Sequence, residues 1–259
     1  MNIRRKKYNN LGIFIQARLG STRFPQKIIY KADSKKNVID YLITRLLKVF
    51  DKEQIYILTT KKIKDKKFCY NLANKYEINF FFGSENNLLK RYYDCAKKFK
   101  IKKIIRITSD CPLVDPFLIK SFIRKSNDHK NYDYYTNCAP YESRSYAVGS
   151  DIEIVNFNIL KKIIKKNNSI YDKEHITPLL LKTKYYHFKS KTNDRYFRFT
   201  LDYKKDLLVI KKIIRQEKIN KKIITYREII EFLKANPSIS KNNSRYVSLY
   251  YKKKIRDKN

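Results

Sequence analysis

Short apolar runs alternate along the chain with segments whose apolar residues recur at helical spacing. In residues 87–99, for example, Leu88, Tyr92 and Cys95 fall on one helical face. Such alternation is typical of βα units that build a largely parallel sheet. The predicted strands are residues 12–16, 54–59, 78–82, 103–108, 132–136, 151–155 and 196–201. The predicted helices are residues 38–50, 87–99, 204–216 and 226–234, with another that begins at Pro116, and residues 137–150 are predicted to be a loop or a hairpin excursion.

This pattern covers the middle of the chain and leaves two polar ends. We expect a basic leader over residues 1–10, one α/β domain over residues 11–236, and a basic tail over residues 237–259 with an aromatic patch at 246–251. A chain of 259 residues with 42% hydrophobic and 14% aromatic residues can bury a substantial core. We therefore expect a folded protein rather than a disordered polycation.

Several features favour a cytoplasmic protein with no membrane partner. No apolar run approaches the roughly 20 residues of a membrane span. The apolar stretch after the leader, residues 11–15, is too short for a signal peptide. The four cysteines have neither zinc-site nor redox-motif spacing, which fits a reducing compartment.

The charge balance raises a different possibility. With 60 Lys and Arg against 24 Asp and Glu, the formal net charge is +36, and such an excess can bind nucleic acid. However, the bases recur as short pairs around apolar pairs, as in residues 161–166 and 211–215, which is typical of solvated helix faces. We expect no specific nucleic-acid partner. The alternative is a basic nucleic-acid-binding protein that also uses the many tyrosines, and its affinity would depend steeply on salt.

A loop with phosphate-binding chemistry follows the first predicted strand. In open α/β sheets, ligands bind at the carboxyl ends of the strands. Glycine allows close backbone approach there, and Arg and Lys form charge-assisted bonds to phosphate oxygens. No acidic residue precedes Asp33, and the four glycines are too far apart for a P-loop or a dinucleotide fingerprint. The candidate residues of this loop are Ala17, Arg18, Gly20, Ser21, Arg23 and Lys27.

Acidic residues stand at or beside three later strands. Asp110 and Asp202 each follow a predicted strand, where a carboxylate either holds Mg²⁺ against a polyphosphate or serves a turn or helix cap. Asp151 and Glu153 alternate along a strand and therefore point to one face, where they bind a cation, orient a sugar hydroxyl or face solvent. We assign Asp115 to the cap of the helix at Pro116.

The loop sequence from residue 16 to 27, Gln-Ala-Arg-Leu-Gly-Ser-Thr-Arg-Phe-Pro-Gln-Lys, resembles the nucleotide-binding loop of the sugar-acid (acylneuraminate) cytidylyltransferases, most closely their SpsF-like branch. The resemblance implies that Arg18, Arg23 and Lys27 hold the triphosphate of CTP, and that Ala17, Gly20 and Ser21 line the nucleotide. It also implies catalytic roles for Arg18, Lys27 and Asp110.

Further segments resemble motifs of the same family in the same order, between residues 11 and 213: residues 82–92, 106–113, 149–154, 173–178 and 199–207. They imply that Gly83 and Ser84 lie near the nucleotide base, although Gly83 also ends a strand and Ser84 can cap the next helix. They imply metal binding by Asp110 and Asp202. Acceptor contacts are implied for Asp151, Glu153, Glu174 and His175. Asp206, in the first turn of a predicted helix, we assign to the helix dipole.

The resemblance implies a three-layer α/β/α nucleotide-diphospho-sugar transferase fold, GT-A-like and Rossmann-like, with a mostly parallel mixed sheet. The implied activity is a Mg²⁺-dependent transfer of CMP from CTP to a sugar acid, with release of pyrophosphate, in surface polysaccharide biosynthesis. A homodimer is implied as well. A glycosyltransferase with a nucleotide-sugar donor is an alternative on the same fold, and it would release a nucleoside diphosphate instead.

Overall fold

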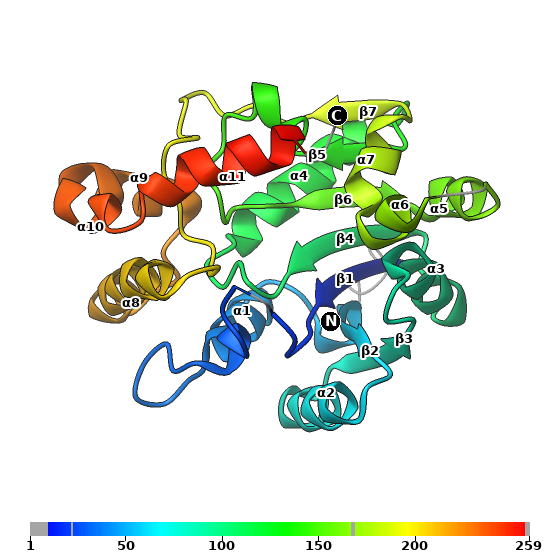
Figure 1. Cartoon of the computed structure of the whole chain (residues 1–259), viewed down its shortest axis with the longest axis horizontal. Coiled ribbons are helices and arrows are strands. Elements are labelled where there is room, and N and C mark those ends of the chain that lie inside the picture. Colours follow the sequence, from blue (N-terminus) through cyan, green and yellow to red (C-terminus); the bar gives the residue numbers. More distant parts are fainter. Residues whose placement is uncertain (1–9, 22, 167–168, 257–259) are drawn as a thin grey trace, which may run out of the picture.

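In the described part of the chain, a seven-stranded mixed sheet has the strand order β3-β2-β1-β4-β6-β5-β7 (Figure 1). The computed structural model describes residues 10–21, 23–166 and 169–256, so the expected leader lies outside the described residues except for Asn10. β1 to β4 are mutually parallel, β6 is antiparallel to both β4 and β5, and β7 is parallel to β5. The strands are β1 (Leu11–Gln16), β2 (Ile55–Thr60), β3 (Asn79–Gly83), β4 (Lys103–Thr108), β5 (Tyr134–Thr136), β6 (Glu153–Asn156) and β7 (Tyr185–His187).

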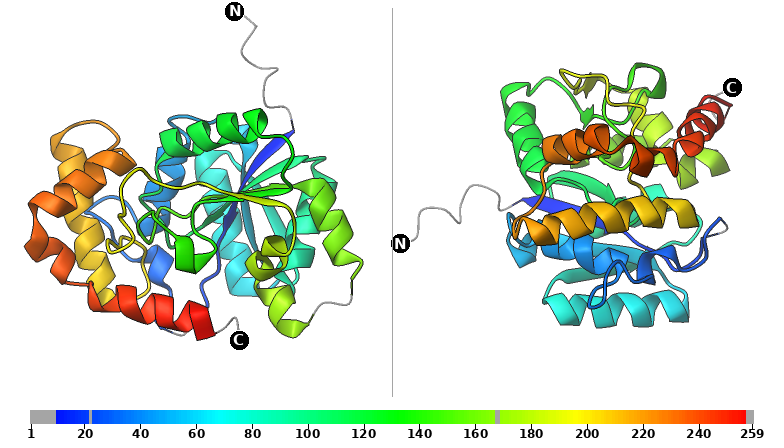
Figure 2. Two further views of the ribbon diagram at one scale, coloured as in Figure 1. Left: turned by 90° about the horizontal axis from the view of Figure 1, so that it is seen from above. Right: turned by 90° about the vertical axis from the view of Figure 1, so that its left-hand side faces the viewer.

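Helices cover both faces of this sheet, which gives three layers (Figure 2). The alternation of side chains along β1 shows why, since Ile13 and Ile15 enter one core and Phe14 enters the other. On the first face lie α1 (Val38–Leu46), α2 (Ile63–Tyr76), α4 (Pro116–Asp128), α8 (Lys204–Ile219) and α9 (Tyr226–Ala235). On the second lie α3 (Leu88–Lys98), α5 (Phe157–Ile164) and α7 (Ile176–Leu181), with α6 (Ile170–Glu174) beside α3. The predicted α/β/α fold with a mostly parallel mixed sheet is confirmed.

One predicted strand is wrong. Residues 196–201 form no strand and share only an isolated bridge, between Val148 and Arg198, with the preceding loop. The pairing stops there because Gly149, at φ 110°, turns its chain away after two hydrogen bonds that join Val148 to Phe197 and Phe199. The loop prediction for residues 137–150 holds, with one short 3-10 helix, η3 (Tyr141–Ser143).

The expected tail is helical and packs on the domain. α10 (Pro237–Lys241) and α11 (Arg245–Arg256) follow α9 directly. Val247 and Tyr251 of α11 pack against Val148, and in Figure 1 the red α11 runs across the body of the molecule. No helix within the described part of the chain is long and apolar enough to cross a bilayer.

Candidate active site

The candidate residues meet at one edge of the sheet. The carboxyl ends of the parallel strands β1 and β4 lie there, followed by the loop of residues 17–27 and by Asp110. The antiparallel β6 brings its first residue, Glu153, to the same edge, opposite Arg106. This edge is where an open α/β sheet binds its ligands.

Lys27 joins the two carboxylates that the sequence singled out. Its Nζ lies 2.7 Å from Asp110 Oδ2 and 2.8 Å from Asp202 Oδ1. Arg23 Nη2 lies 2.7 Å from the same Oδ1 of Asp202. Residues that are up to 179 positions apart therefore form one cluster.

The charges of this cluster stabilise one another. Burial alone would lower the pKa of the Lys27 ammonium, but the charges of Asp110 and Asp202 and their hydrogen bonds outweigh it and raise that pKa. Burial would likewise raise the pKa of Asp202, yet the charges of Lys27, Arg23 and Arg198 lower it to about 2. Lys27 is therefore charged and Asp202 ionised at neutral pH.

Two carboxylates that converge on one cation suit a magnesium site. No group of three or more His, Cys, Asp and Glu side chains in the described ranges could hold a metal by itself. Mg²⁺ at nucleotide sites is commonly bound by one or two carboxylates, with phosphate oxygens and water as the remaining ligands. Asp110 and Asp202 fit that pattern. Asp110 is the more accessible of the two, with 27% of its side chain exposed against 8%.

A buried network behind Asp202, which the sequence did not reveal, fixes that carboxylate. Arg198 donates to Asp202 Oδ2 at 2.9 Å and makes two bonds to Asp206, at 2.9 and 3.0 Å. Asp206 also accepts hydrogen bonds from the backbone N–H groups of Asp202 and Tyr203, at 2.8 and 2.9 Å. The assignment of Asp206 to the helix dipole is thus incomplete, because Asp206 holds the residues before α8 in place. The one sequence signal was a charged Arg inside an apolar run.

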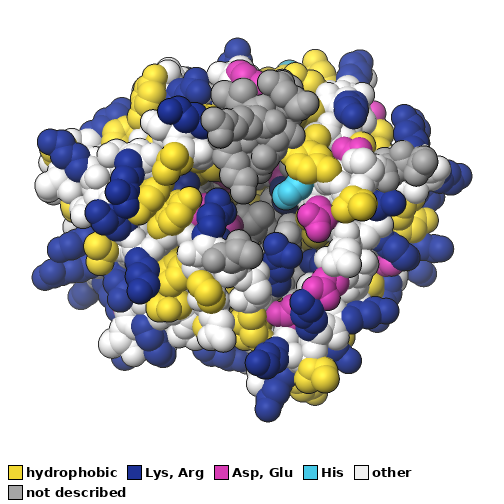
Figure 3. Space-filling model, viewed as in Figure 1, with side chains coloured by type: hydrophobic (Ala, Val, Ile, Leu, Met, Phe, Trp, Pro, Cys, Tyr) yellow, Lys and Arg dark blue, Asp and Glu magenta, His cyan; other side chains and the backbone are white. Residues whose placement is uncertain are grey.

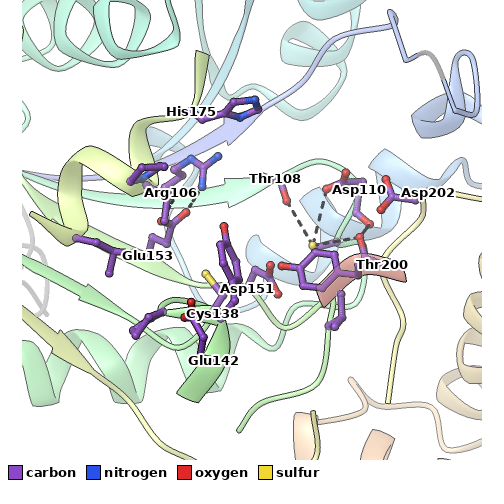
Figure 4. Close-up of a pocket in the computed structure, with 18 of the residues that line it drawn as sticks. Arg106, Thr108, Asp110, Cys138, Glu142, Asp151, Glu153, His175, Thr200 and Asp202 are labelled. Carbon is purple, nitrogen blue, oxygen red and sulfur yellow. Dashed lines mark hydrogen bonds and ion pairs between the residues drawn. The ribbon is translucent and has the colours of Figure 1, made fainter. Parts of the chain in front are cut away.

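A cavity of about 700 Å³ adjoins the cluster. Its volume is within the usual range for small-molecule sites. Figure 4 shows the carboxylates of Asp110, Asp151, Glu153 and Asp202 around it, together with His175. The structure therefore brings the expected metal ligands and three of the four expected acceptor contacts to a single cavity. Glu174 is exposed and does not line this cavity.

Asp151 and Glu153 have different surroundings, although both line the cavity. Asp151 Oδ1 lies 2.6 Å from Arg144 Nη2, and about a quarter of the Asp151 side chain is exposed. Glu153 is buried, pairs with Arg106 and Tyr134, and accepts a bond from Thr177 Oγ1 at 2.9 Å. Each carboxylate is paired with an arginine, so neither has the free-energy cost of an unpaired buried charge.

The remaining loop residues lie outside this cavity. Arg18 and Gly20 are exposed and Ser21 is half-buried, whereas Ala17 is buried and its N–H donates to Leu58 O at 3.0 Å. The charge of Arg18 is close enough to contribute, after burial, to a lowered pKa of Arg91. Arg18 thus lies on the side of the site formed by the start of α3.

Gly83 and Ser84 are on that same side. Arg91 Nε donates to Ser84 O at 2.9 Å, and a Cβ on Gly83 would lie 2.5 Å from Arg91 Cγ. The helix cap is Asn87, whose side chain accepts from Lys90 N at 2.8 Å, while Ser84 Oγ accepts from Asn87 N. The cap of α3 is therefore Asn87, and not Ser84 as predicted.

On the face of the molecule seen in Figure 3, the basic side chains of the described residues form no single patch. In Figure 3 Lys and Arg side chains are spread over the face in view, with hydrophobic and neutral side chains between them. On this face the distribution is typical of solvated helix faces.

Comparison with known proteins gives a consistent result. A family model described as Cytidylyltransferase matches residues 13–252. A solved cytidylyltransferase from Leptospira borgpetersenii is 33% identical, with a TM-score of 0.82 over 89% of this chain and 96% of that one. The spore coat polysaccharide biosynthesis protein SpsF of Bacillus subtilis is 28% identical over 88% of this chain and 96% of its own length. A CMP:2-keto-3-deoxy-manno-octonic acid synthetase complexed with CTP shares the fold at 14% identity, with a TM-score of 0.58 over 80% of this chain and 99% of the other.

Proposed function

The chain belongs to the cytidylyltransferase family, and we propose that it is a Mg²⁺-dependent enzyme that joins CMP from CTP to a sugar acid and releases pyrophosphate. The observation that carries the proposal is the convergence of Lys27 on Asp110 and Asp202 beside a cavity large enough for a sugar. The sugar acid and the setting in surface polysaccharide biosynthesis rest on the sequence resemblance and on the similarity to SpsF. A cytoplasmic location and a homodimer rest on the sequence alone.

The reaction needs positioning and electrostatic stabilisation more than covalent chemistry. A hydroxyl oxygen of the acceptor attacks the α-phosphorus of CTP and its proton passes to solvent. A new P–O bond forms, and the bond between the α-phosphorus and the bridging oxygen breaks to release pyrophosphate. Arg18, Arg23 and Lys27 bind the triphosphate and offset the charge that builds on the leaving group.

Lys27 has a second role in this proposal. In the structure it occupies the point at which the two carboxylates meet, so it keeps them together against their mutual repulsion. Asp110 and Asp202 would hold Mg²⁺, which when bound neutralises phosphate oxygens and helps align the α-phosphorus. Gly20, Ser21, Gly83 and Ser84 are assigned to the nucleotide, and Asp151, Glu153 and His175 to the acceptor. The exposed Glu174 is the weakest of the proposed acceptor contacts.

The test is pyrophosphate release from each nucleoside triphosphate with Mg²⁺ and a panel of eight-carbon and nine-carbon sugar acids. We expect release with CTP and one class of sugar acid, and none when the metal is chelated. Release of a nucleoside diphosphate from a nucleotide sugar would instead establish the glycosyltransferase alternative. Steeply salt-dependent binding of DNA or RNA, without pyrophosphate release, would favour the nucleic-acid-binding alternative.

Asp110→Asn tests the carboxylate within this reaction. We expect kcat to fall by at least about 10²-fold, as for the loss of one preorganised electrostatic group. Asp94→Asn is a matched control, because Asp94 lies in α3 and, among the described residues, pairs only with Lys90 in the same helix. A folded Asp110→Asn enzyme with near-normal turnover would remove Asp110 from the mechanism.

A further inference from the structure

The C-terminal helix α11 reaches the cavity with one side chain. Tyr250 lines the cavity together with Asp151 and Tyr141. The same side of the helix is buried, with Tyr246 and Tyr251 9% exposed and Val247 6% exposed, whereas Leu249 is 51% exposed. These positions show that α11 packs on the site with one face and presents its other face to solvent.

Tyr250 is tied to the wall of the cavity through Arg144. Arg144 Nη1 donates to the Tyr250 hydroxyl at 3.3 Å, and the guanidinium carbon lies 5.9 Å from the centre of its ring. The ring also meets Tyr141 edge to face, with 6.0 Å between centroids. Arg144 is buried and binds Asp151 Oδ1, so a chain of contacts runs from α11 to a carboxylate of the cavity.

Asp151 is left with one oxygen for a ligand. Its Oδ1 accepts bonds from Arg144 and, at 3.2 Å, from the N–H of Gly149. Its Oδ2 has no donor among the described residues. A carboxylate held by one oxygen, beside an aromatic ring, is suited to a sugar, whose hydroxyl groups donate hydrogen bonds and whose carbon framework packs on apolar surface.

One turn earlier, α11 contacts the other side of the site. The ring of Tyr246 stacks on that of Tyr203, with 4.0 Å between centroids and 14° between planes. The guanidinium of Arg23 lies 5.7 Å from the centre of the Tyr203 ring, and Arg23 binds Asp202. Tyr246 is therefore connected to the phosphate loop, and Tyr250 to the cavity.

We propose that α11 completes the active site and that Tyr250 is a specificity-determining residue for the acceptor. This inference rests on the proposed function, since it assigns the cavity beside Asp110 to the acceptor sugar. Tyr250 supplies a ring against the sugar and, through Arg144, orients Asp151 toward its hydroxyl groups. Tyr246 is a positioning residue for Arg23, through Tyr203.

Steady-state kinetics separates the two tyrosines. In Tyr250→Ala we expect the KM for the sugar acid to rise about tenfold, as for the loss of one buried aromatic contact, with little change in the KM for CTP. In Tyr246→Ala we expect the reverse, an increased KM for CTP. Leu249→Ala, on the exposed face of the same helix, is the control and should leave both values unchanged.

Tyr250→Phe, and thermal unfolding of each variant, distinguish the loss of a contact with the sugar from a general loss of structure. The Phe variant keeps the ring and loses the hydroxyl that accepts from Arg144, so its KM for the sugar acid should lie between those of the wild type and the Ala variant. An unchanged KM for the sugar acid in a folded Tyr250→Ala enzyme would overturn the assignment. So would equal changes in the two KM values in both Ala variants, which would indicate a general loss of structure.

Thiol labelling tests whether Tyr250 closes the cavity, and it requires no enzymatic activity. Cys111 and Cys138 line the cavity, whereas Cys69 and Cys95 are in the helices α2 and α3. Burial raises the pKa of the Cys138 thiol to about 11, so the folded wild type should react slowly with N-ethylmaleimide. In Tyr250→Ala we expect Cys138 to be labelled several-fold faster, with Cys69 and Cys95 unchanged. Equal labelling of Cys138 in both proteins would show that Tyr250 does not close the cavity, even if pyrophosphate release failed and with it the proposed function.

Discussion

At the scale of single residues, Asp202 is notable for the number of cations around one carboxylate. Oδ1 binds both Lys27 and Arg23, and Oδ2 binds Arg198. With Asp110 and Asp206, three acids stand against three bases, so this partly buried cluster is close to neutral. Such a balance limits the cost of burying the charges.

Asp202 should make stability depend on pH. Its pKa of about 2 in the folded protein is below the value of about 3.9 for an unfolded chain, so its contribution is present above pH 4 and is lost as the pH falls toward 2. We expect this contribution to the free energy of unfolding to be about 2 kcal/mol. Urea unfolding of the wild type and Asp202→Asn between pH 7 and pH 2 measures it. The difference between the two proteins should shrink over the last two pH units, and a constant difference would contradict the assigned pKa.

At the scale of elements, the strands buried on both faces were the most predictable. The limits of residues 103–108 match β4 at both ends, and its three isoleucines, Ile104, Ile105 and Ile107, are fully buried. α2 was not predicted, since five of its fourteen residues are Lys or Asp and few apolar side chains mark its inner face. α6, α7 and β7 are too short for periodicity to reveal them.

Asp115 links two elements that the sequence treats as separate. Its Oδ1 accepts from Phe117 N at 2.8 Å, which confirms the predicted cap of α4. Its Oδ2 accepts from Tyr226 N, also at 2.8 Å, at the start of α9. One carboxylate thus satisfies the first turns of two helices that are 111 positions apart in sequence.

We expect Asp115→Ala to lower the free energy of unfolding by about 2 kcal/mol or more, since a single cap is worth about 1 kcal/mol and this one is buried and serves two helices. Asp115→Asn keeps one acceptor oxygen and should lose about half as much. Urea unfolding monitored by circular dichroism gives both values. If the Asn variant proved as stable as the wild type, the second bond, to α9, would contribute nothing.

At the scale of the whole molecule, the backbone at Gly149 packs closely on the backbone of Phe199 and Thr200, and this contact connects two parts of the site. Gly149 has a φ of 110°, and a Cβ there would lie 2.5 Å from Thr200 N and 2.7 Å from the carbonyl carbon of Phe199. The segment of residues 199–201 also contacts Asp110, whose carbonyl oxygen accepts from Leu201 N at 2.8 Å and from Thr200 Oγ1 at 3.0 Å. The spacing between Asp110, Asp151 and Asp202 depends on this packing.

Gly149→Ala should therefore affect both the fold and the site. We expect a loss of stability on the order of 3 kcal/mol from backbone strain and displacement, together with reduced pyrophosphate release. Gly20→Ala is the matched control for stability, because a Cβ at Gly20 meets no atom within 4 Å and should leave the unfolding temperature unchanged. A Gly149→Ala protein as stable as the Gly20→Ala protein would show that the backbone of Phe199 and Thr200 moves aside at little cost in free energy.

By itself the sequence determined the α/β class, the polar loop of residues 17–27 and the two carboxylates that follow Ile107-Thr108 and Leu201, because buried strands and the polar residues at their ends are local patterns. Only the tertiary structure decided that Lys27 bridges those carboxylates, that Glu153 is buried against Arg106, and that α11 adds Tyr250 to the cavity. Each of these depends on which distant segments meet at one edge of the sheet. Local periodicity contains no information about contacts between distant segments, since strand order and the packing of whole layers determine them.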